Sequence, residues 1–307
     1  MTSDAAPTLE WRWRPQEPVD VRRTLGMLGK GPYDPAHAVA PDGAVWRASS
    51  MPSGAVTYRV TVRDGEVVAH LWGDGAADAA DELGPLLGRD DDWSGFEARL
   101  PLVAEARRRH PGLRLPTQRR IFETLVPIVI EQRVPGVDAY ASWRRLVRRY
   151  GAPAPGPVPR PMWVPPSAEQ WRAVPSWAWH RAGVDPGRAR TVVAAAQRAS
   201  AVQRLVDLPV TEASRRLRSL DGVGAWTAAE VMVRLGDGDA VSVGDYNLAK
   251  DVGWLFDGSP GDDTRMLELV EPWRPHRGRM LRLLLASGVL VRPRRGPRIT
   301  REDHRAR

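Results

Sequence analysis

The sequence predicts an α+β protein, with a small N-terminal mixed α/β domain over residues 1–112 and a bilobal all-α domain over residues 113–291. Alternating apolar residues around a tight turn are confined to the N-terminal part, which indicates strands there. From Thr117 onward, apolar residues recur at helical spacing almost throughout. A proline-rich stretch over residues 151–166 cannot be helical, so we expect an extended surface linker between the two helical lobes. The Arg- and Pro-rich tail over residues 292–307 is expected to be disordered.

The N-terminal domain is expected to contain a β-hairpin. Residues 56–62 alternate between apolar and polar, Asp64-Gly65 supplies a turn, and residues 66–72 run back. Asp-Gly tolerates the positive φ angles of a type I′ turn. Further strands are expected over residues 8–14 and 44–48, and helices over residues 19–28 and 76–87. A small sheet with helices on one face is the simplest assembly of these elements.

The second domain is expected to be built from helices. Ile121, Leu125 and Ile128 share one face of the first helix, and Trp143 and Leu146 share one face of the next. Further helices are expected over residues 167–172, 186–200, 211–219, 226–235, 246–256, 264–269 and 277–290.

Composition and charge narrow the class of protein. The chain has no cysteine, which excludes disulfides, thiolate zinc sites and iron–sulfur clusters. Its formal charge of +8 favours a polyanionic partner such as nucleic acid, although ordinary solvated surface can account for most of that charge. No apolar run approaches the roughly 18–20 residues that span a bilayer, and the N-terminus lacks a secretory signal. We therefore expect a cytoplasmic protein with no membrane partner.

The most informative segment is a helical corner near residue 222. A helix leads into the turn Leu220-Asp-Gly-Val-Gly224, and a second helix starts at about Ala225. Gly222 and Gly224 let the backbone turn sharply and approach another surface closely. The free amides and positive dipole end of the second helix suit a phosphate. Taken by itself, the motif is better explained as an ordinary corner that uses glycine as a helix C-cap.

Asp245 follows this corner at the start of a new helix. A polar connection over residues 236–239 separates it from the second helix of the corner. Aspartate is among the best N-cap residues, so its position needs no catalytic explanation. Taken alone, Asp245 is therefore best explained as a helix cap.

With Gly222, Gly224 and Asp245, the sequence resembles the helix-hairpin-helix DNA glycosylase superfamily, whose signature is a Gly-hydrophobic-Gly hairpin followed by an aspartate at a helix N-terminus. Flanking segments resemble the 3-methyladenine DNA glycosylase II branch of that superfamily. They are Pro111-Gly-Leu-Arg-Leu-Pro116, Phe122, Ile130-Glu-Gln-Arg-Val134 and Trp273-Arg-Pro-His-Arg277. The N-terminal domain would then resemble half of a TATA-binding protein, and the resemblance covers roughly residues 8–290.

The resemblance implies a monofunctional glycosylase of base excision repair that acts on double-stranded DNA. It would flip a damaged base, with alkylated purines as the expected substrate, and Asp245 would stabilise the oxocarbenium-like transition state. Bifunctional relatives carry a lysine nucleophile two residues after the last hairpin glycine, where this chain has Trp226. We therefore expect no AP-lyase activity, although Lys250 lies close to Asp245 in the sequence. We expect a monomer with no cofactor, apart from a possible monovalent cation at the hairpin carbonyls.

The resemblance also implies a base pocket and a DNA wedge. Trp226 would stack on the extruded base, or equally be a core residue. Glu230 and Leu285 occupy pocket positions where the family has aromatic residues; Glu230 would contact the base or remain a solvated surface residue. The wedge that fills the gap in the DNA would be Gln132 or Arg133. The DNA-binding hairpin comprises Gly222, Val223, Gly224 and Ala225.

Three alternatives stay open at this stage. The enzyme can act on another lesion, such as an oxidised or deaminated base. The chain can instead be a non-catalytic DNA-binding protein that uses the hairpin only as a phosphate clamp. Finally, Asp237, Asp239 and Asp245 can hold a divalent metal for phosphodiester cleavage, although acidic loops are usually solvated turns.

Overall fold

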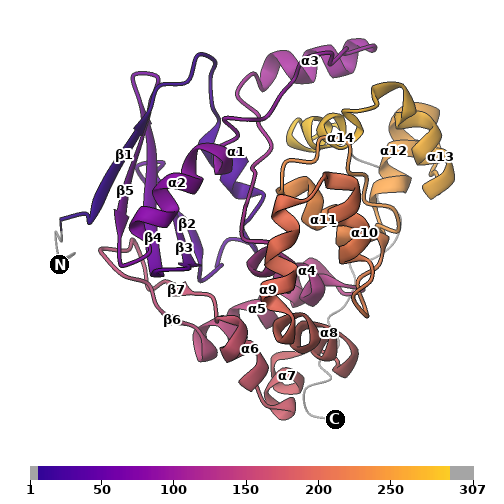
Figure 1. Cartoon of the computed structure of the whole chain (residues 1–307). Coiled ribbons are helices and arrows are strands. Elements are labelled where there is room, and N and C mark those ends of the chain that lie inside the picture. The colour runs from indigo at the N-terminus through magenta and orange to yellow at the C-terminus, as the bar shows by residue number, and fades with distance from the viewer. Residues whose placement is uncertain (1–5, 291–307) are drawn as a thin grey trace.

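The computed structural model describes residues 6–290, and its N-terminal part is a five-stranded antiparallel sheet (Figure 1). The strands are β1 (Leu9–Trp13), β2 (His37–Val39), β3 (Val45–Met51), β4 (Gly54–Arg63) and β5 (Glu66–Trp72), in the spatial order β1-β5-β4-β3-β2. The predicted hairpin is confirmed, because Arg63 pairs with Glu66 across Asp64 and Gly65, whose φ angles are 50° and 76°. The three-residue strand β2 is too short to show alternation and was not predicted.

Two helices cover one face of the sheet, as predicted. They are α1 (Val21–Gly26) and α2 (Ala76–Leu86). Leu25 and Leu83 are fully buried and share a core with Tyr58 and Leu71 of the sheet. Successive side chains of a strand point to opposite faces of the sheet, so every second residue of β4 and β5 packs against the helices.

The proline-rich segment covers part of the opposite face, so the expectation of a surface linker was wrong for that part. It contains the short strands β6 (Ala152–Pro153) and β7 (Trp163–Val164), which pair with each other. Met162 and Val164 are buried against Trp46 and Trp72, whose rings stack 5.5 Å apart. The proline content excluded a helix correctly, but the apolar residues spaced two apart at its end dock it on the sheet.

The helical region forms two lobes, each with its own core. The first lobe comprises α4 (Ile121–Glu131), α5 (Gly136–Tyr150), α6 (Ala168–Ala173), α7 (Ser176–Ala182), α8 (Pro186–Gln197), α9 (Ala199–Gln203), the 3₁₀ helix η1 (Arg204–Asp207), α10 (Val210–Leu217) and α11 (Ala225–Arg234). At its centre Trp171 stacks against both Trp143 and Trp179, at 6.1 Å and 5.4 Å between ring centroids. Of these three residues, Trp179 also lines the cavity described below.

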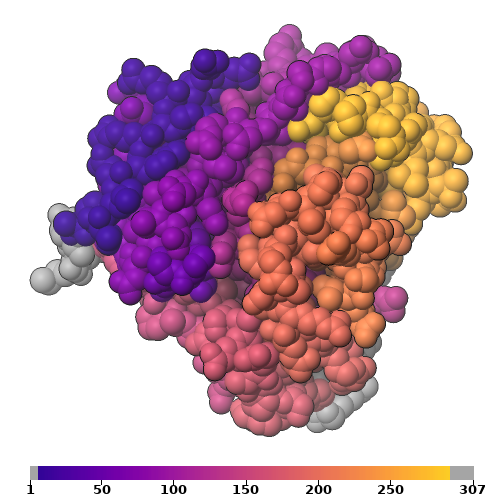
Figure 2. Space-filling model, in the orientation of Figure 1, coloured from indigo at the N-terminus to yellow at the C-terminus, as the bar shows by residue number. Residues whose placement is uncertain are grey.

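The second lobe combines α3 (Pro101–Arg109), which follows the N-terminal sheet domain in the chain, with the C-terminal helices. It comprises α3, α12 (Leu248–Asp257), α13 (Asp263–Val270), the 3₁₀ helix η2 (Glu271–Trp273) and α14 (Arg277–Ala286). Val103 and Ala106 of α3 pack with Met280 and Leu284 of α14, and Figures 1 and 2 show α3 beside the yellow C-terminal helices. The sequence analysis assigned this segment to the N-terminal domain, because α3 was not predicted.

No helix within residues 6–290 has both the length and the apolar character that a membrane span requires. The tail over residues 292–307 lies outside the described residues.

Candidate functional site

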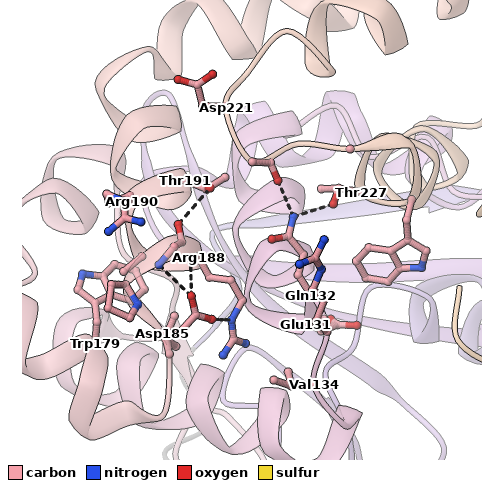
Figure 3. Close-up of a pocket in the computed structure, with 18 of the residues that line it drawn as sticks. Glu131, Gln132, Val134, Trp179, Asp185, Arg188, Arg190, Thr191, Asp221 and Thr227 are labelled. Atoms are coloured by element: carbon pink, nitrogen blue, oxygen red, sulfur yellow. Dashed lines mark hydrogen bonds and ion pairs between the residues drawn. The ribbon is translucent and has the colours of Figure 1, made fainter. Parts of the chain in front are cut away.

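A cavity opens where four segments of the chain meet (Figure 3). Residues 131–136 between α4 and α5 form one wall, and residues of α6, α7 and α8 form the wall opposite. The glycine corner and the start of α11 contribute residues 221, 222 and 224–227, and residues 243–247, which precede α12, complete the lining. The cavity therefore brings together the corner, Trp226 and Asp245, which the sequence analysis had connected only by spacing.

The predicted hairpin lies between α10 and α11. Gly222 has a φ angle of 82°, and a Cβ atom there would lie 2.0 Å from Thr191 Oγ1. Val223 is buried in the lobe core, whereas Gly224 is extended and exposed at the N-cap of α11. The first amides of a helix have no intrahelical acceptor, so those of α11 can bind an anion.

Asp245 is held in one orientation by three donors. Its Oδ1 accepts the backbone N–H groups of Asn247 and Leu248, each at 2.8 Å. Its Oδ2 accepts the indole Nε1–H of Trp226 at 3.1 Å. The carboxylate thus binds the backbone just ahead of α12, whose N-cap residue is Asn247, and is held at the wall of the cavity.

The two predicted wedge residues differ in their surroundings. The Gln132 side-chain amide donates to the Gly222 carbonyl oxygen and to Thr227 Oγ1, both at 2.8 Å (Figure 3). Arg133 is exposed and has a φ angle of 56°, which is rare for a residue with a side chain. Gln132 therefore joins the α4–α5 turn to the hairpin, while Arg133 projects from that turn.

Glu230 does not line the cavity, and its predicted contact with the base needs correction. Its Oε1 accepts Arg282 Nη2 at 2.8 Å and the Ser242 hydroxyl, and its Oε2 accepts Arg234 Nη1 at 2.6 Å. Burial opposes ionisation of this carboxyl, but the Arg282 and Arg234 guanidiniums outweigh it and hold its pKa well below the usual range. Glu230 is therefore a buried structural anion between α11 and α14.

The predicted pocket residue Leu285 and the predicted acidic metal ligands also do not form the sites expected for them. Leu285 is 43% exposed on α14 and is not among the residues that line the cavity. Asp239 is engaged by Arg277, at 2.6 Å from Nη2 to Oδ2, and by Arg274 at 3.2 Å. Within residues 6–290 no group of three or more acidic, His or Cys side chains is arranged to hold a metal ion, so Asp237, Asp239 and Asp245 do not form the alternative metal site.

A supporting pair behind the α4–α5 turn, Arg188 and Asp185, was not predicted from the sequence. The buried Arg188 donates from Nη1 to the Ile130 carbonyl oxygen and from Nε to Asp185. Asp185 also accepts the backbone N–H groups of Gly187 at 2.8 Å and of Arg188 at 3.1 Å, which caps α8. The Asp-Pro pair at the start of α8 is a sequence signal for the helix cap. No sequence signal predicts the long-range hydrogen bond from Arg188 to Ile130.

Comparison with solved structures identifies the fold. A 3-methyladenine DNA glycosylase from Archaeoglobus fulgidus has a TM-score of 0.76 at 19% identity, over 91% of this chain and 98% of the other. MBOgg1 in complex with a low-affinity DNA ligand has a TM-score of 0.73 at 16% identity, over 91% and 95% of the two chains. The 8-oxoguanine glycosylase/lyase of Clostridium acetobutylicum, bound to double-stranded DNA with cytosine opposite 8-oxoguanine, has a TM-score of 0.70 at 13% identity, over 92% and 98%.

No protein-family model matches the sequence, and no curated protein matches it. The structural similarity extends over nearly the whole length of each of these three solved chains. The chain therefore has the DNA glycosylase fold that the resemblance predicted.

Proposed function

We propose that the protein is a monofunctional DNA glycosylase of base excision repair that removes a damaged purine, with alkylated purines as the preferred class, from double-stranded DNA. One arrangement carries the proposal. Asp245 accepts a hydrogen bond from Trp226, lies just before α12 and lines the same cavity as the glycine hairpin. The fold shared with DNA glycosylases supports the same reading.

The hairpin and its surroundings would hold the DNA backbone. The free amides at the start of α11 suit one phosphate. The cavity wall also carries the exposed Arg133 and Arg190, whose charges suit neighbouring phosphates. A strand held there would present its sugar to Asp245 and its extruded base to the cavity.

Asp245 would act on the bond between the sugar and the base. When the C1′–N bond breaks, its electron pair leaves with the base and positive charge develops on the sugar ring. A fixed carboxylate stabilises that charge, and water then adds to C1′ and releases its proton. An N3- or N7-alkylated purine is already cationic and leaves as a neutral base, so this step needs no dedicated acid.

Arg133 is the better candidate for the wedge. Both donors of the Gln132 amide are engaged with the hairpin and with Thr227, so that side chain supports the turn. The exposed Arg133 projects from the same turn in a left-handed backbone conformation. Such strained positions occur where a side chain must be aimed at a ligand.

A lyase step would require an amine nucleophile beside Asp245. Trp226 occupies the position expected for that lysine, and Lys250 lies with its Nζ 3.9 Å from the centre of the exposed Tyr246 ring. We expect no covalent protein–DNA adduct when the enzyme is treated with borohydride on DNA that contains an abasic site. An adduct that disappears in Lys250→Ala would overturn the monofunctional assignment.

The proposed function is tested by base release from methylated duplex DNA, with chromatography of the freed bases. Wild type should release 3-methyladenine or 7-methylguanine, and Asp245→Asn should be slower by about 10²–10³-fold because it loses the negative charge. Asparagine can still cap α12, so the variant should remain folded and bind DNA. Release only from duplexes that carry an oxidised or deaminated base would change the substrate class, and no base release from any of these duplexes would contradict the proposal.

A further inference from the structure

The carboxylate of Glu131 also lines the cavity. Glu131 is the last residue of α4 and precedes Gln132, whose amide binds Thr227, the residue after Trp226 (Figure 3). Glu131 therefore stands on the wall that joins the α4–α5 turn to the start of α11. Its side chain is 20% exposed, so the carboxylate is largely sheltered from solvent but accessible from the cavity.

A buried lysine from the N-terminal domain supports Glu131 from behind. Lys30 Nζ lies 2.5 Å from Glu131 Oε1, and the Lys30 side chain is only 4% exposed. Burial lowers the pKa of Lys30 below its usual value, and the neighbouring Glu131 partly opposes this shift. A buried ammonium group is costly without a partner, so the pairing is a fixed feature of the fold.

The loop that carries Lys30 is itself built into the helical lobe. The buried Asp34 accepts the Lys30 backbone N–H at 2.7 Å and the Trp143 indole N–H at 3.0 Å. Gly31 has a φ angle of 81°, and a Cβ atom there would lie 2.7 Å from the Tyr140 ring. Glycine thus lets this loop approach Tyr140, which also lines the cavity, and delivers Lys30 to Glu131.

Glu131 differs from the other cavity carboxylates in what its oxygens bind. Both oxygens of Asp185 and both of Asp245 accept hydrogen bonds from protein donors. Asp221 is exposed at the corner. Lys30 contacts Oε1 of Glu131, and no donor within residues 6–290 binds Oε2. One oxygen of a sheltered carboxylate is thus left for a ligand.

We propose that Glu131, paired with Lys30, is a specificity-determining residue that accepts N–H groups of the extruded base and favours a positively charged purine over a neutral one. This inference rests on the proposed function. Glu131 lines the cavity and Lys30 does not, so the negative charge dominates the field that a base in the cavity experiences. Charge-assisted hydrogen bonds are also the stronger ones, which favours the N–H groups of a cationic base.

The test compares two duplexes, one with a single 7-methylguanine and one with a single hypoxanthine, which is neutral. The measured quantity is the ratio of kcat/KM for release of the two bases. Glu131→Gln should lower this ratio by about tenfold, because it removes the charge and keeps the shape. Glu169→Gln, an exposed residue of α6, removes the same charge away from the cavity and should leave the ratio unchanged.

A second variant separates recognition from a merely structural role. Lys30→Met combined with Glu131→Gln removes both buried charges, so it avoids the unpaired ammonium that could unfold the single variant. The double variant should show the same tenfold lower ratio. An unchanged ratio in the folded single variant, or a ratio restored by the double variant, would overturn the inference.

A binding experiment distinguishes failure of the proposed function from failure of this inference. If wild type releases no base, equilibrium binding of the same two duplexes tests Glu131 without any chemistry. Tighter binding of the 7-methylguanine duplex that is lost in Glu131→Gln would then support the inference, and equal binding of the two duplexes by wild type would overturn it.

Discussion

The conformation of a single glycine positions the hairpin. Gly222 combines a positive φ with a site where Thr191 leaves no room for a Cβ atom, whereas Gly224 has nothing within 4 Å of such an atom. We expect Gly222→Ala to lower the free energy of unfolding by about 1–3 kcal/mol, and Gly224→Ala to stay within about 0.5 kcal/mol of wild type. Chemical denaturation of the three proteins checks this, and equal losses in the two variants would contradict it.

The residues of the site were predictable to different degrees. Asp245 and the glycines could be placed because their roles depend on local backbone geometry, which short sequence spacing encodes. Glu230 was misplaced because helical spacing puts it on a face near that of Trp226, while its partners Arg282 and Ser242 are distant in sequence. Glu131 and Lys30 come from different domains, so no local pattern connects them.

At the scale of elements, Arg188 joins α8 to the end of α4. Its replacement by Met would leave the Ile130 carbonyl without its donor and Asp185 without its ion-pair partner. Because Arg188 is buried, we expect a loss of about 3 kcal/mol in the free energy of unfolding and slower base release. Thermal denaturation alongside the activity assay measures both effects.

Arg190 provides the matched control on the same helix. It is exposed at the cavity wall, so Arg190→Ala should change the unfolding free energy by less than about 0.5 kcal/mol. Its effect should fall on DNA binding, by reducing the slope of log affinity against log salt by about 1. If Arg190→Ala lost as much stability as Arg188→Met, the difference in burial would not explain the role of Arg188.

The contact between α11 and α14 should depend on pH through Glu230. Its folded-state pKa lies below that of the unfolded chain, so its contribution is present above about pH 4.3 and is lost as the pH falls further. Glu230→Gln should be less stable than wild type by about 3 kcal/mol at pH 7, and the difference should shrink toward pH 3. Urea denaturation at both pH values tests this; a difference that stays constant with pH would rule it out.

Helices and strands were predicted correctly where the local sequence pattern was strong. The Asp64-Gly65 hairpin and the long amphipathic helices α4 and α5 were predicted because turn chemistry and apolar periodicity agree. The short helix α7 and the basic helix α3 were missed, since their helical state depends on packing against α8 and α14 respectively. Tertiary contacts can override weak local preference in this way.

At the scale of the whole molecule, the sheet domain contributes directly to the cavity lobe. Lys30 contacts Glu131, and the Met27 carbonyl oxygen accepts Arg234 Nε at 2.8 Å. The order of domains along the chain was apparent from composition, but this coupling between them was not. This coupling is the basis of the proposal that Glu131 and Lys30 together affect which base the helical lobe accepts.

The net charge of the chain should govern its overall affinity for DNA. Residues 292–307 are rich in arginine and carry part of the formal charge of +8. Removal of these residues should make the salt dependence of DNA binding shallower, because fewer counterions are released from the DNA. Binding titrations over a range of salt concentrations measure this slope. An unchanged slope would show that the tail makes no electrostatic contribution.

The central claim, that Asp245 stabilises positive charge on the sugar, is tested most directly by binding to two abasic-site analogues. A pyrrolidine analogue carries a positive charge near the position of C1′ and mimics the transition state, and a neutral tetrahydrofuran analogue of similar shape does not. Wild type should bind the pyrrolidine duplex at least tenfold more tightly, and Asp245→Asn should bind both equally. Equal binding by wild type, or a preference that survives in Asp245→Asn, would contradict the account.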